Sequence, residues 1–524
     1  MDFSVVLIIL ILVILGFVVI LKKPDSNDNI GSDTNSGEDS PSQNDSNSGS
    51  NTSSSSTSKS GGSSGVGSSL LNQLSMINAR SFPALSKNQL PNKTPAFFGR
   101  KDAILEVMGR SWESGGPICL YGEKGAGKTS LAIELAHQLA PKYPDAQFYI
   151  DLKGVGDKPM HVNKAMGQVL RAFFPKEPIP SDTAELVQQY EATLKGKRVL
   201  MLIENATKPS QIKRLMAGKS VLLIFTSENK ISIPGSYSKP VKELFPDEAE
   251  LLLFFLASNT KRWATEIIEL CGYSPMAIAL TGSYIKANPD LSVETLIREL
   301  REERRLLKPE GDVDLEEDKN KKETIDRNVD PIFNIVFRDM RKETATVFRK
   351  LALFSGSFDD KAAAGICGDR DGDHLGRLVA LKLLEYDGIN KRYFFHDLIH
   401  KLIKTEVRPS EKILTHRNLA FYYFDVLKDA NDLYDSDEDA LESALNLFDL
   451  DWYNIEAGQK WSSQKSTEDA KIAKLCGDFC KEARVLMPMR HTTEECIQWN
   501  ESALEASRDS ENVEAEKNNL LSLG

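Results

Sequence analysis

GEKGAGKTS, residues 122–130, is the stretch of sequence that decides the fold of this chain. It matches the pattern G-x-x-x-x-G-K-[ST]. The apolar run 117–121 precedes it and the amphipathic segment 131–139 follows, so the sequence predicts a strand, a loop and a helix. In such a loop, backbone N–H groups turn toward phosphate oxygens and the helix directs its positive end at the same anion. The stretch therefore predicts a site for a nucleoside triphosphate.

Two side chains of this loop have expected roles. Lys128 is expected to reach the β- and γ-phosphates, and the Thr129 hydroxyl is expected to hold Mg²⁺. The predicted cofactors are therefore ATP or ADP with Mg²⁺. We expect the whole loop to line the nucleotide: Gly122, Glu123, Lys124, Gly125, Ala126, Gly127, Lys128, Thr129 and Ser130.

Short apolar runs alternate with helical patterns around this loop. This alternation predicts a parallel sheet covered by helices on both faces, with ligands at the carboxyl ends of the strands. We assign residues 89–240 to this nucleotide-binding domain. The expected strands are 148–150, 199–203, 221–225 and a weaker run around Val241, and the expected helices include 162–173 and 183–194.

Glu204 directly follows one of the expected strands. A carboxylate there can order Mg²⁺ through its water shell, so Thr129 and Glu204 are the candidate metal ligands, and Lys128 and Glu204 the candidate catalytic residues. A strand-end charge facing solvent is the alternative for Glu204. The next residue, Asn205, cannot act as a general base, because a base needs a titratable group. We therefore expect ATP/ADP binding with slow or absent hydrolysis.

Three further segments carry a resemblance to a known family, and a fourth, residues 226–228, departs from its pattern. Residues 95–102 read PAFFGRKD, which resembles the F-x-G-R-[ED] entry motif of STAND ATPases. The resemblance implies that Phe98, Gly99 and Arg100 lie against the adenine and ribose. Residues 226–228 read TSE where that family usually has T-[ST]-R. The family's arginine contacts the γ-phosphate, and Glu228 cannot do so.

The other two segments lie beyond residue 240. Residues 271–280 read CGYSPMAIAL and resemble the G-x-x-P-x-A-[IL] segment of NB-ARC proteins, whose proline packs on the adenine. A purely capping role for Ser274 and Pro275 at a helix start stays open. Residues 395–397 read FHD and resemble the M-H-D motif, in which the histidine touches the β-phosphate of ADP. His396 as a helix cap is the alternative.

These motifs keep the family's order between residues 98 and 397, so the chain looks like an NB-ARC-type STAND ATPase. We therefore predict an α/β P-loop NTPase with a parallel sheet, followed by a helical domain, a winged helix and an α-helical repeat-like region. The predicted boundaries are 241–305 for the helical domain, 306–328 for a charged connector, 329–408 for the winged helix and 409–524 for a tetratricopeptide-like region. The expected winged-helix elements are helices at 331–354, 359–366 and 373–384 and a hairpin turning at 387–388.

The tetratricopeptide-like region has two clear helical signals. Apolar residues from Ile472 to Ala483 fall on one helix face, and Thr492 with Glu495 forms a predicted capping box. Only one or two repeat units fit before Gly524, and a small helical cap that binds nothing is the alternative to a protein-binding surface. We expect an unidentified protein partner here. Buried thiols are expected at Cys476 and Cys480, because the partners of a zinc site are lacking.

The N-terminus predicts a membrane anchor and a tether. Residues 3–21 are nineteen residues without a charge, enough to span a bilayer as a helix, with a cleaved signal peptide as the alternative. We assign 1–23 to this N-terminal transmembrane helix and 24–88 to a disordered Ser/Asn/Gly-rich linker. Lys22 and Lys23 favour a single-pass membrane protein whose nucleotide-binding portion is cytoplasmic.

Composition narrows the function classes. A net charge of −11 argues against broad nucleic-acid affinity, which normally requires a basic surface, so no nucleic-acid partner is expected. We interpret the chain as a membrane-anchored signalling switch that forms a homo-oligomer in its ATP state, by analogy with defence and cell-death relatives. An ATP-dependent transcription regulator and an AAA-like motor are the two alternatives.

Overall fold

The structure is a computed structural model that describes residues 86–94, 96–114, 116–152, 160–307, 328–436, 440–509, 516–517 and 519–520. The predicted transmembrane segment 3–21, nearly all of the predicted linker 24–88 and most of the charged connector 306–328 lie outside these residues. Within the described ranges, no helix is both long enough and apolar enough to span a membrane.

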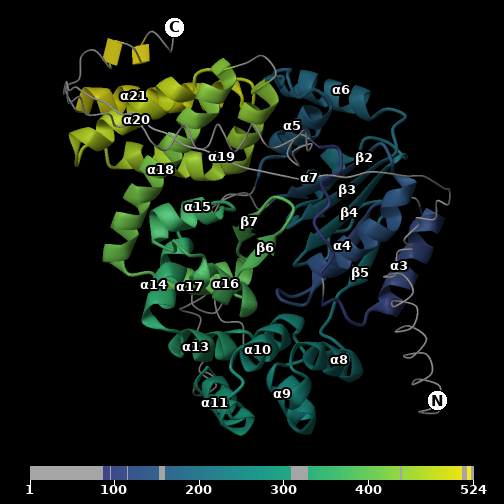
Figure 1. The fold of residues 1–524 in the computed structure, drawn as a ribbon. Helices are drawn as coiled ribbons and strands as arrows, with labels where there is room; N and C mark the ends of the chain where they lie inside the picture. Colours follow the sequence, from purple (N-terminus) through teal and green to yellow (C-terminus); the bar gives the residue numbers. More distant parts are fainter. Residues whose placement is uncertain are drawn as a thin grey trace, which may run out of the picture. The chain divides into compact units, whose positions relative to one another are not determined.

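A parallel sheet of five strands, in the order β2-β3-β4-β1-β5, forms the nucleotide-binding part (Figure 1). The register aligns Leu120 of β1 with Thr226 of β4, so the strand before the loop lies beside the strand that ends at Ser227. Such continuous apolar runs suit strands that are buried on both faces. The strands are β1 (Ile118–Tyr121), β2 (Ala146–Asp151), β3 (Val199–Glu204), β4 (Val221–Ser227) and β5 (Tyr237–Pro240). The weaker strand predicted around Val241 ends just before that residue.

Helices cover both faces of this sheet, and alternate residues of β3 pack against the helices on opposite faces. Leu200 and Leu202 belong to the core cluster that contains α3 and α4, whereas Met201 and Ile203 belong to the cluster with α5 to α7. This division follows from the period of two along a strand. The parallel α/β core predicted from the sequence is therefore confirmed. The helices are α3 (Lys101–Ser114), α4 (Lys128–Leu139), η1 (Ala140–Lys142), α5 (Val162–Phe173), α6 (Thr183–Leu194) and α7 (Pro209–Leu215).

The middle of the described chain is helical apart from one hairpin. It contains α8 (Pro246–Leu256), η2 (Ser258–Trp263), α9 (Ala264–Leu270), α10 (Pro275–Ala287) and α11 (Val293–Leu306). After the connector follow α13 (Asp330–Arg338), α14 (Lys342–Leu351), α15 (Asp360–Ala362), η3 (Ala363–Cys367), α16 (Asp373–Ala380), β6 (Glu385–Asp387), β7 (Arg392–Phe394) and α17 (Asp397–Thr405). The hairpin strands β6 and β7 pair antiparallel on either side of residues 388–391.

The prediction of one helix over 331–354 is wrong, because the structure has two helices there. The backbone of Arg341 is extended, with φ −56° and ψ 140°, and this interrupts the helical hydrogen bonds. The break lets the chain fold back, so that the rings of Phe333 and Phe337 in α13 lie 6.5 and 6.4 Å from the ring of Phe348 in α14. A continuous helix would hold Phe333 and Phe348 about 22 Å apart.

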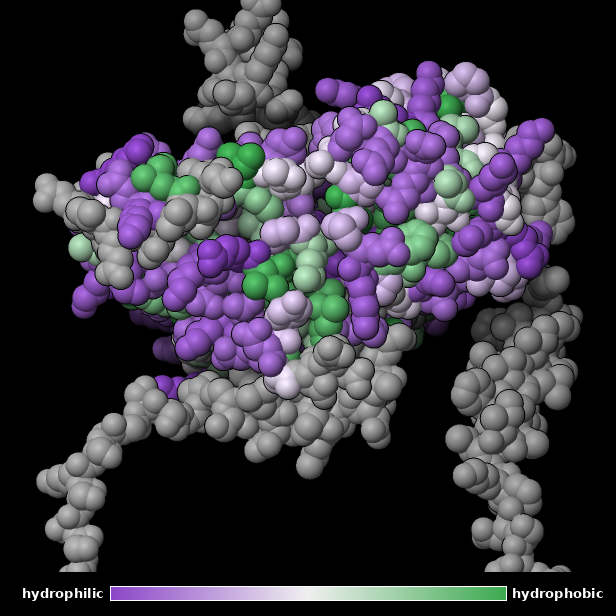
Figure 2. Space-filling model, turned by 90° about the horizontal axis from the view of Figure 1, so that it is seen from above, coloured by the Kyte–Doolittle hydropathy of each residue, from purple (hydrophilic) through white to green (hydrophobic). Residues whose placement is uncertain are grey.

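The C-terminal region consists of α18 (Pro409–Ser436), α19 (Leu441–Gln464), α20 (Ala470–Ala483) and α21 (Thr493–Asp509). The helical character predicted for this region is confirmed. The predicted face of α20 is buried, and its members are Ile472, Leu475, Cys476, Phe479, Cys480 and Ala483. The predicted capping box is also present: Glu495 N donates to Oγ1 of Thr492 at 3.4 Å and Thr492 N donates to Oε2 of Glu495 at 3.1 Å. The surface seen in Figure 2 is mainly hydrophilic, with hydrophobic side chains in scattered groups.

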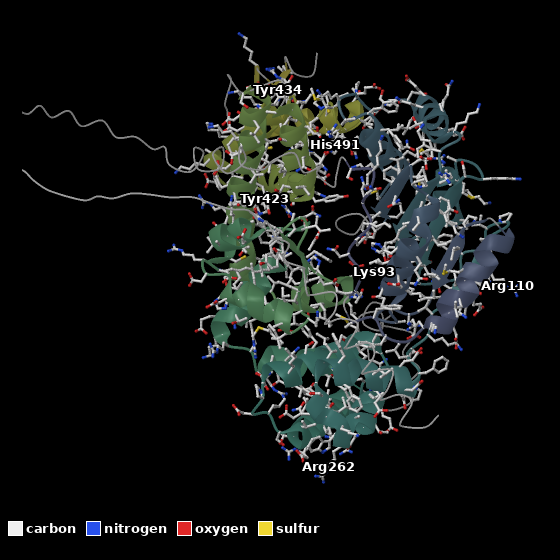
Figure 3. All side chains as sticks on the ribbon, turned by 45° about the vertical axis from the view of Figure 1, so that its right-hand side comes forward. Lys93, Arg110, Arg262, Tyr423, Tyr434 and His491 are labelled. Carbon is white, nitrogen blue, oxygen red and sulfur yellow. The ribbon has the colours of Figure 1, made fainter. Side chains whose placement is uncertain are left out.

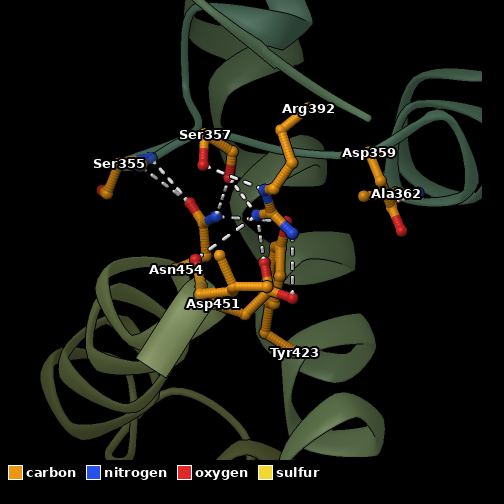
Figure 4. A network of polar contacts seen from close by, with 10 residues as sticks. Ser355, Ser357, Asp359, Ala362, Arg392, Tyr423, Asp451 and Asn454 are labelled. Carbon is orange, nitrogen blue, oxygen red and sulfur yellow. Dashed lines mark hydrogen bonds and ion pairs between the residues drawn. The ribbon is translucent and has the colours of Figure 1, made fainter. Parts of the chain in front are cut away.

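A buried polar network joins the hairpin to the C-terminal region (Figure 4). Arg392 of β7 forms an ion pair with Asp451 of α19, and the two side chains are only 7% and 9% exposed. Arg392 Nε also donates to Oγ of Ser357 at 2.9 Å. Asn454, one turn after Asp451, donates through Nδ2 to the carbonyl of Ser357 at 2.9 Å and to the Tyr423 hydroxyl at 3.2 Å. The network fixes the hairpin against α18 and α19.

Asp451→Ala should destabilise the C-terminal region by about 3–5 kcal/mol, because it leaves the buried guanidinium of Arg392 without its counter-charge. Urea unfolding followed by tryptophan fluorescence reports on this region, since Trp452 and Trp499 lie in it with ring centroids 5.3 Å apart. Lys474→Ala is the matched control, because it removes an exposed ion pair within α20 and should cost less than about 0.5 kcal/mol. Equal losses in the free energy of unfolding for the two variants would contradict a stabilising role of the network.

Candidate nucleotide site

The glycines of the phosphate loop have backbone conformations and surroundings that exclude other residues. Gly127 has φ +84° and is the N-cap of α4. Gly122 has φ +156°, and a Cβ atom there would lie 2.2 Å from the carbonyl oxygen of Val241. The loop can therefore lie against the end of β5 only if position 122 has no side chain.

Lys128, the first residue of α4, extends back along the loop. Its Nζ donates to the carbonyls of Gly122 at 2.9 Å and Glu123 at 2.7 Å. Burial lowers the pKa of Lys128, and the carboxylate of Glu228 is the largest charge that opposes this shift. An ammonium has three protons, so Lys128 can retain a donor for a phosphate oxygen while it holds the loop.

Glu204 lies at the centre of a small cluster of hydroxyls. Its Oε2 accepts hydrogen bonds from Thr129 Oγ1 at 2.8 Å and from Thr226 Oγ1 at 2.6 Å. Burial raises the pKa of Glu204 to about 7, and the nearby charge of Asp151 adds to this rise. Its Oε1 is buried and has no hydrogen-bond partner among the described residues. A buried carboxylate oxygen without a donor, beside a threonine hydroxyl, fits a hydrated Mg²⁺.

Asn205 turns its side chain away from this cluster toward the next strand. Its Nδ2 donates to Oδ1 of Asp151 at 2.9 Å, and its backbone N donates to Oγ1 of Thr226 at 3.1 Å. Asn205 has φ +58°, a left-handed conformation that asparagine tolerates better than most residues. The side chain after Glu204 therefore has a structural role between β2 and β4.

The predicted entry motif lies beside the loop. Arg100 Nη2 donates to the carbonyls of Ala126 and Lys242, each at 2.7 Å. The Arg100 backbone N donates to Oε1 of Glu248 in α8, and a Cβ at Gly99 would collide with the Glu248 side chain. The ring of Phe98 lies 5.1 Å from that of Phe255. The motif thus links the loop to α8. No sequence pattern was assigned to Glu248, although an acidic residue three positions after Phe245 is typical of a helix start.

The start of α10 also lies at the loop. A Cβ added at Gly127 would be 3.6 Å from Cγ of Pro275, and one added at Gly125 would be 3.5 Å from Oγ of Ser274. Ser274 is the N-cap of α10 and accepts from Ala277 N at 3.5 Å, and Pro275 is the first helical residue. The capping role predicted for these two residues is confirmed, and it brings both of them to the loop.

His396 is the N-cap of α17, and its Nδ1 accepts from Leu398 N at 3.3 Å. Leu398 makes the approach to the loop, because its Cδ2 would lie 3.9 Å from a Cβ at Gly125. Phe395, which replaces the methionine of the M-H-D motif, stacks on Phe348 at 5.8 Å and on His400 at 4.8 Å. His396 therefore caps α17, and this helix begins next to the loop.

A second contact with the nucleotide-binding part was not expected from the sequence. Arg490, between α20 and α21, donates through Nη1 to the carbonyl of Pro175 at 3.0 Å and pairs through Nε with Asp449 at 2.9 Å. Arg171 of α5 donates to the Arg490 carbonyl at 2.8 Å. The neighbouring residue, His491 (Figure 3), lies against Trp452, with ring centroids 3.8 Å apart and the ring planes tilted by 33°. The guanidinium of Arg490 is almost fully buried, and nothing in its sequence context indicated this.

No protein-family model matches the chain. Two curated relatives match it at nearly equal sequence identity. The chain is 30% identical over 366 residues to the regulatory protein AfsR of Streptomyces coelicolor. The matched stretch covers 65% of this chain and 35% of that protein. It is 29% identical over 353 residues to the regulatory protein AfsR of Streptomyces griseus, again 35% of that protein. The chain thus spans about a third of the length of the curated relatives that it matches.

Two solved structures are similar at low sequence identity. One is a signal transduction ATPase with numerous domains (STAND) with a tetratricopeptide repeat sensor from Pyrococcus horikoshii: 14% identity, 83% of this chain, 74% of that chain and a TM-score of 0.42. The other is a Walker-type ATPase of Pyrococcus abyssi: 11% identity, 60% of this chain, 97% of that chain and a TM-score of 0.29. The α/β core with its phosphate loop and the helical C-terminal region are described from the chain's own structure. In sequence, the chain is similar to two proteins named as regulatory.

Proposed function

We propose that this chain is a nucleotide-dependent signalling switch that binds ADP or ATP with Mg²⁺ and assembles into a homo-oligomer when ATP replaces ADP. One observation carries the proposal: three segments far apart in the sequence meet at the phosphate loop. Arg100 holds the Ala126 carbonyl, Pro275 lies beside Gly127 and Leu398 lies beside Gly125. A ligand at the loop would therefore touch the segments that must separate if the chain opens.

The metal would be held by Thr129 and Glu204. When bound, Mg²⁺ would neutralise part of the phosphate charge. Thr129 would turn its hydroxyl from Glu204 to the metal, and Glu204 would order its waters through the oxygen that lacks a donor. This arrangement requires the ionised carboxylate, whereas burial favours the neutral form. Metal binding should therefore release a proton near neutral pH.

His396 is proposed to stabilise the ADP state through its second ring nitrogen. Because Nδ1 accepts from the backbone of Leu398, the proton of the neutral ring lies on Nε2. That N–H can donate to a phosphate oxygen while the cap remains intact. Capping and phosphate recognition are thus compatible in one side chain.

The energy needed for such a switch is within reach of a few contacts. Moving a population from 1:99 to 99:1 takes about 5.5 kcal/mol of differential binding. Charge-assisted hydrogen bonds contribute about 1.5–3 kcal/mol each, so two or three contacts that differ between ADP and ATP states suffice. We assign these differing contacts to Lys128, Thr129 and His396.

The chain offers little for fast hydrolysis. Asn205 is not titratable, its amide is bonded to Asp151, and Glu228 stands where an arginine would serve the γ-phosphate. We therefore favour a switch over an AAA-like motor. An ATP-dependent transcription regulator is the second candidate, favoured by the similarity to two proteins named as regulatory. The net charge of −11 counts against it.

The proposal extends to the parts of the chain outside the described residues. Residues 3–21 would anchor the switch as a single-pass membrane protein with its nucleotide-binding portion in the cytoplasm. Assembly of the ATP state would then bring several anchors together in the bilayer. The C-terminal helices would receive the activating signal from a protein partner.

Lys128→Ala should abolish nucleotide retention, because it removes the cation that faces the phosphates. The measurement is the amount of adenine nucleotide released on denaturing the purified protein. Lys176→Ala removes an exposed lysine near α5 and should leave the content unchanged. Equal nucleotide content in the Lys128→Ala variant and the wild type would contradict the site.

Glu204→Gln should stabilise the nucleotide-free protein at pH 8 and have less effect at pH 5.5. The raised pKa means that the neutral carboxyl's contribution to stability is full below pH 4.5 and is lost as the pH rises through about 7. The shift corresponds to about 3 kcal/mol at about 1.4 kcal/mol per pKa unit. Melting temperatures at the two pH values check this, with Glu177→Gln, an exposed glutamate, as control. With Mg²⁺ and ADP at pH 8, the wild type should have the higher melting temperature, since only the wild type keeps the carboxylate that holds the metal.

His396→Ala should loosen the ADP state and increase assembly, as measured by size-exclusion profiles with ADP. His396→Asn is the informative companion, because asparagine keeps a capping acceptor and loses the imidazole. Increased assembly in both variants supports contact with the phosphate. An increase in the alanine variant alone would assign His396 to helix capping only.

A further inference from the structure

We propose that the ion pair between Lys124 and Glu228 makes this site select a nucleoside diphosphate over a triphosphate. This inference rests on the proposed nucleotide function and adds a specificity-determining residue to it. Lys124 Nζ lies 3.0 Å from Oε1 of Glu228, and both side chains are about half exposed. Lys124 belongs to the phosphate loop, whereas Glu228 is the first residue after β4.

The fold fixes Glu228 opposite the loop. β1 and β4 are neighbours, with Tyr121 aligned to Ser227. The loop's first amide, Gly122 N, donates to the Ser227 carbonyl at 3.2 Å, so the residues after each strand start level with one another. The register of the sheet therefore places the backbone of residue 228 beside the start of the loop, and the Glu228 side chain reaches Lys124 from there.

The carboxylate of Glu228 acts on both ammonium groups of the loop. It pairs with Lys124 directly, and it exerts the largest favourable charge effect on Lys128. Glu204, which acts on Lys128 more weakly, lies at the proposed metal position. Glu228 thus places negative charge beside both lysines of the loop.

A third phosphate would compete with this carboxylate. The first two phosphates of a nucleotide would accept hydrogen bonds from the backbone amides of the loop and from the remaining donor of Lys128. A γ-phosphate would meet Lys124 already paired and a carboxylate of like charge beside it. Because the pair is about half exposed, water screens the repulsion, and we expect a discrimination of about tenfold between ADP and ATP.

The test compares the dissociation constants of Mg²⁺–ADP and Mg²⁺–ATP for the full chain in mild detergent, measured by competition with a fluorescent adenine nucleotide. The wild type should bind ADP about ten times more tightly than ATP. Glu228→Gln should bring the two constants close together, mainly by tightening ATP. Glu191→Gln, an exposed glutamate of α6, removes the same charge elsewhere and should keep the wild-type ratio.

Ionic strength gives a second measurement. Raising the salt concentration should bring the ratio of the ATP and ADP dissociation constants closer to one in the wild type, because the discrimination is electrostatic. The same ratio should stay unchanged in the Glu228→Gln variant. If both nucleotides bind and Glu228→Gln keeps the wild-type ratio, the inference is wrong and the proposed function stands. If the ratio changes because ADP binds more weakly, Glu228 only shapes the loop, and the inference is also wrong. If the wild type binds neither nucleotide, the proposed function itself fails.

Discussion

The approach of two helix starts to the glycines of the phosphate loop is the constraint on which the proposed switch depends. Gly125 and Gly127 have positive φ and no side chain, and Ser274, Pro275 and Leu398 occupy the space beside them. The positive φ would strain any other residue at either position, and an added Cβ atom would already touch α10 or α17 at van der Waals distance. The same two glycines therefore shape the phosphate cradle and allow the later segments to close on it. Binding and closure share one structural requirement.

Two buried arginines extend this constraint to the C-terminal helices. Arg392 ties the hairpin before α17 to Asp451 in α19. Arg490 ties the α20–α21 junction to α5, because its carbonyl accepts from Arg171. Arg490 bonds Asp449 on the same helix that carries Asp451. Because buried charges resist separation from their partners, α19 is held rigidly between the two contacts. A signal that displaces α19 would act on the hairpin and on α5 together.

Much of the nucleotide-binding part could be predicted from local sequence. The loop, the strands and the bounds of α5 and α6 follow from patterns within a few residues. The contacts of Glu248 with Arg100 and of Arg490 with Pro175 join residues about 150 and 315 positions apart, and no local pattern encodes such pairs. The break at Arg341 was missed for a related reason. Apolar periodicity continues through it, and the turn is needed for Phe333 and Phe337 to pack on Phe348.

The charge balance at the loop explains why a diphosphate and a triphosphate should have different consequences. Lys128 is bonded to two neutral carbonyls, so a phosphate oxygen gives it a stronger, charged partner. Lys124 already has a carboxylate, so a further phosphate would replace one anion by another with little gain. The first exchange favours binding, whereas the second also brings a like charge beside Glu228 and is unfavourable unless Glu228 moves away. Occupation of the γ-position is therefore coupled to the position of the residue that follows β4, and through Gly122 and Ser227 to the start of the loop itself.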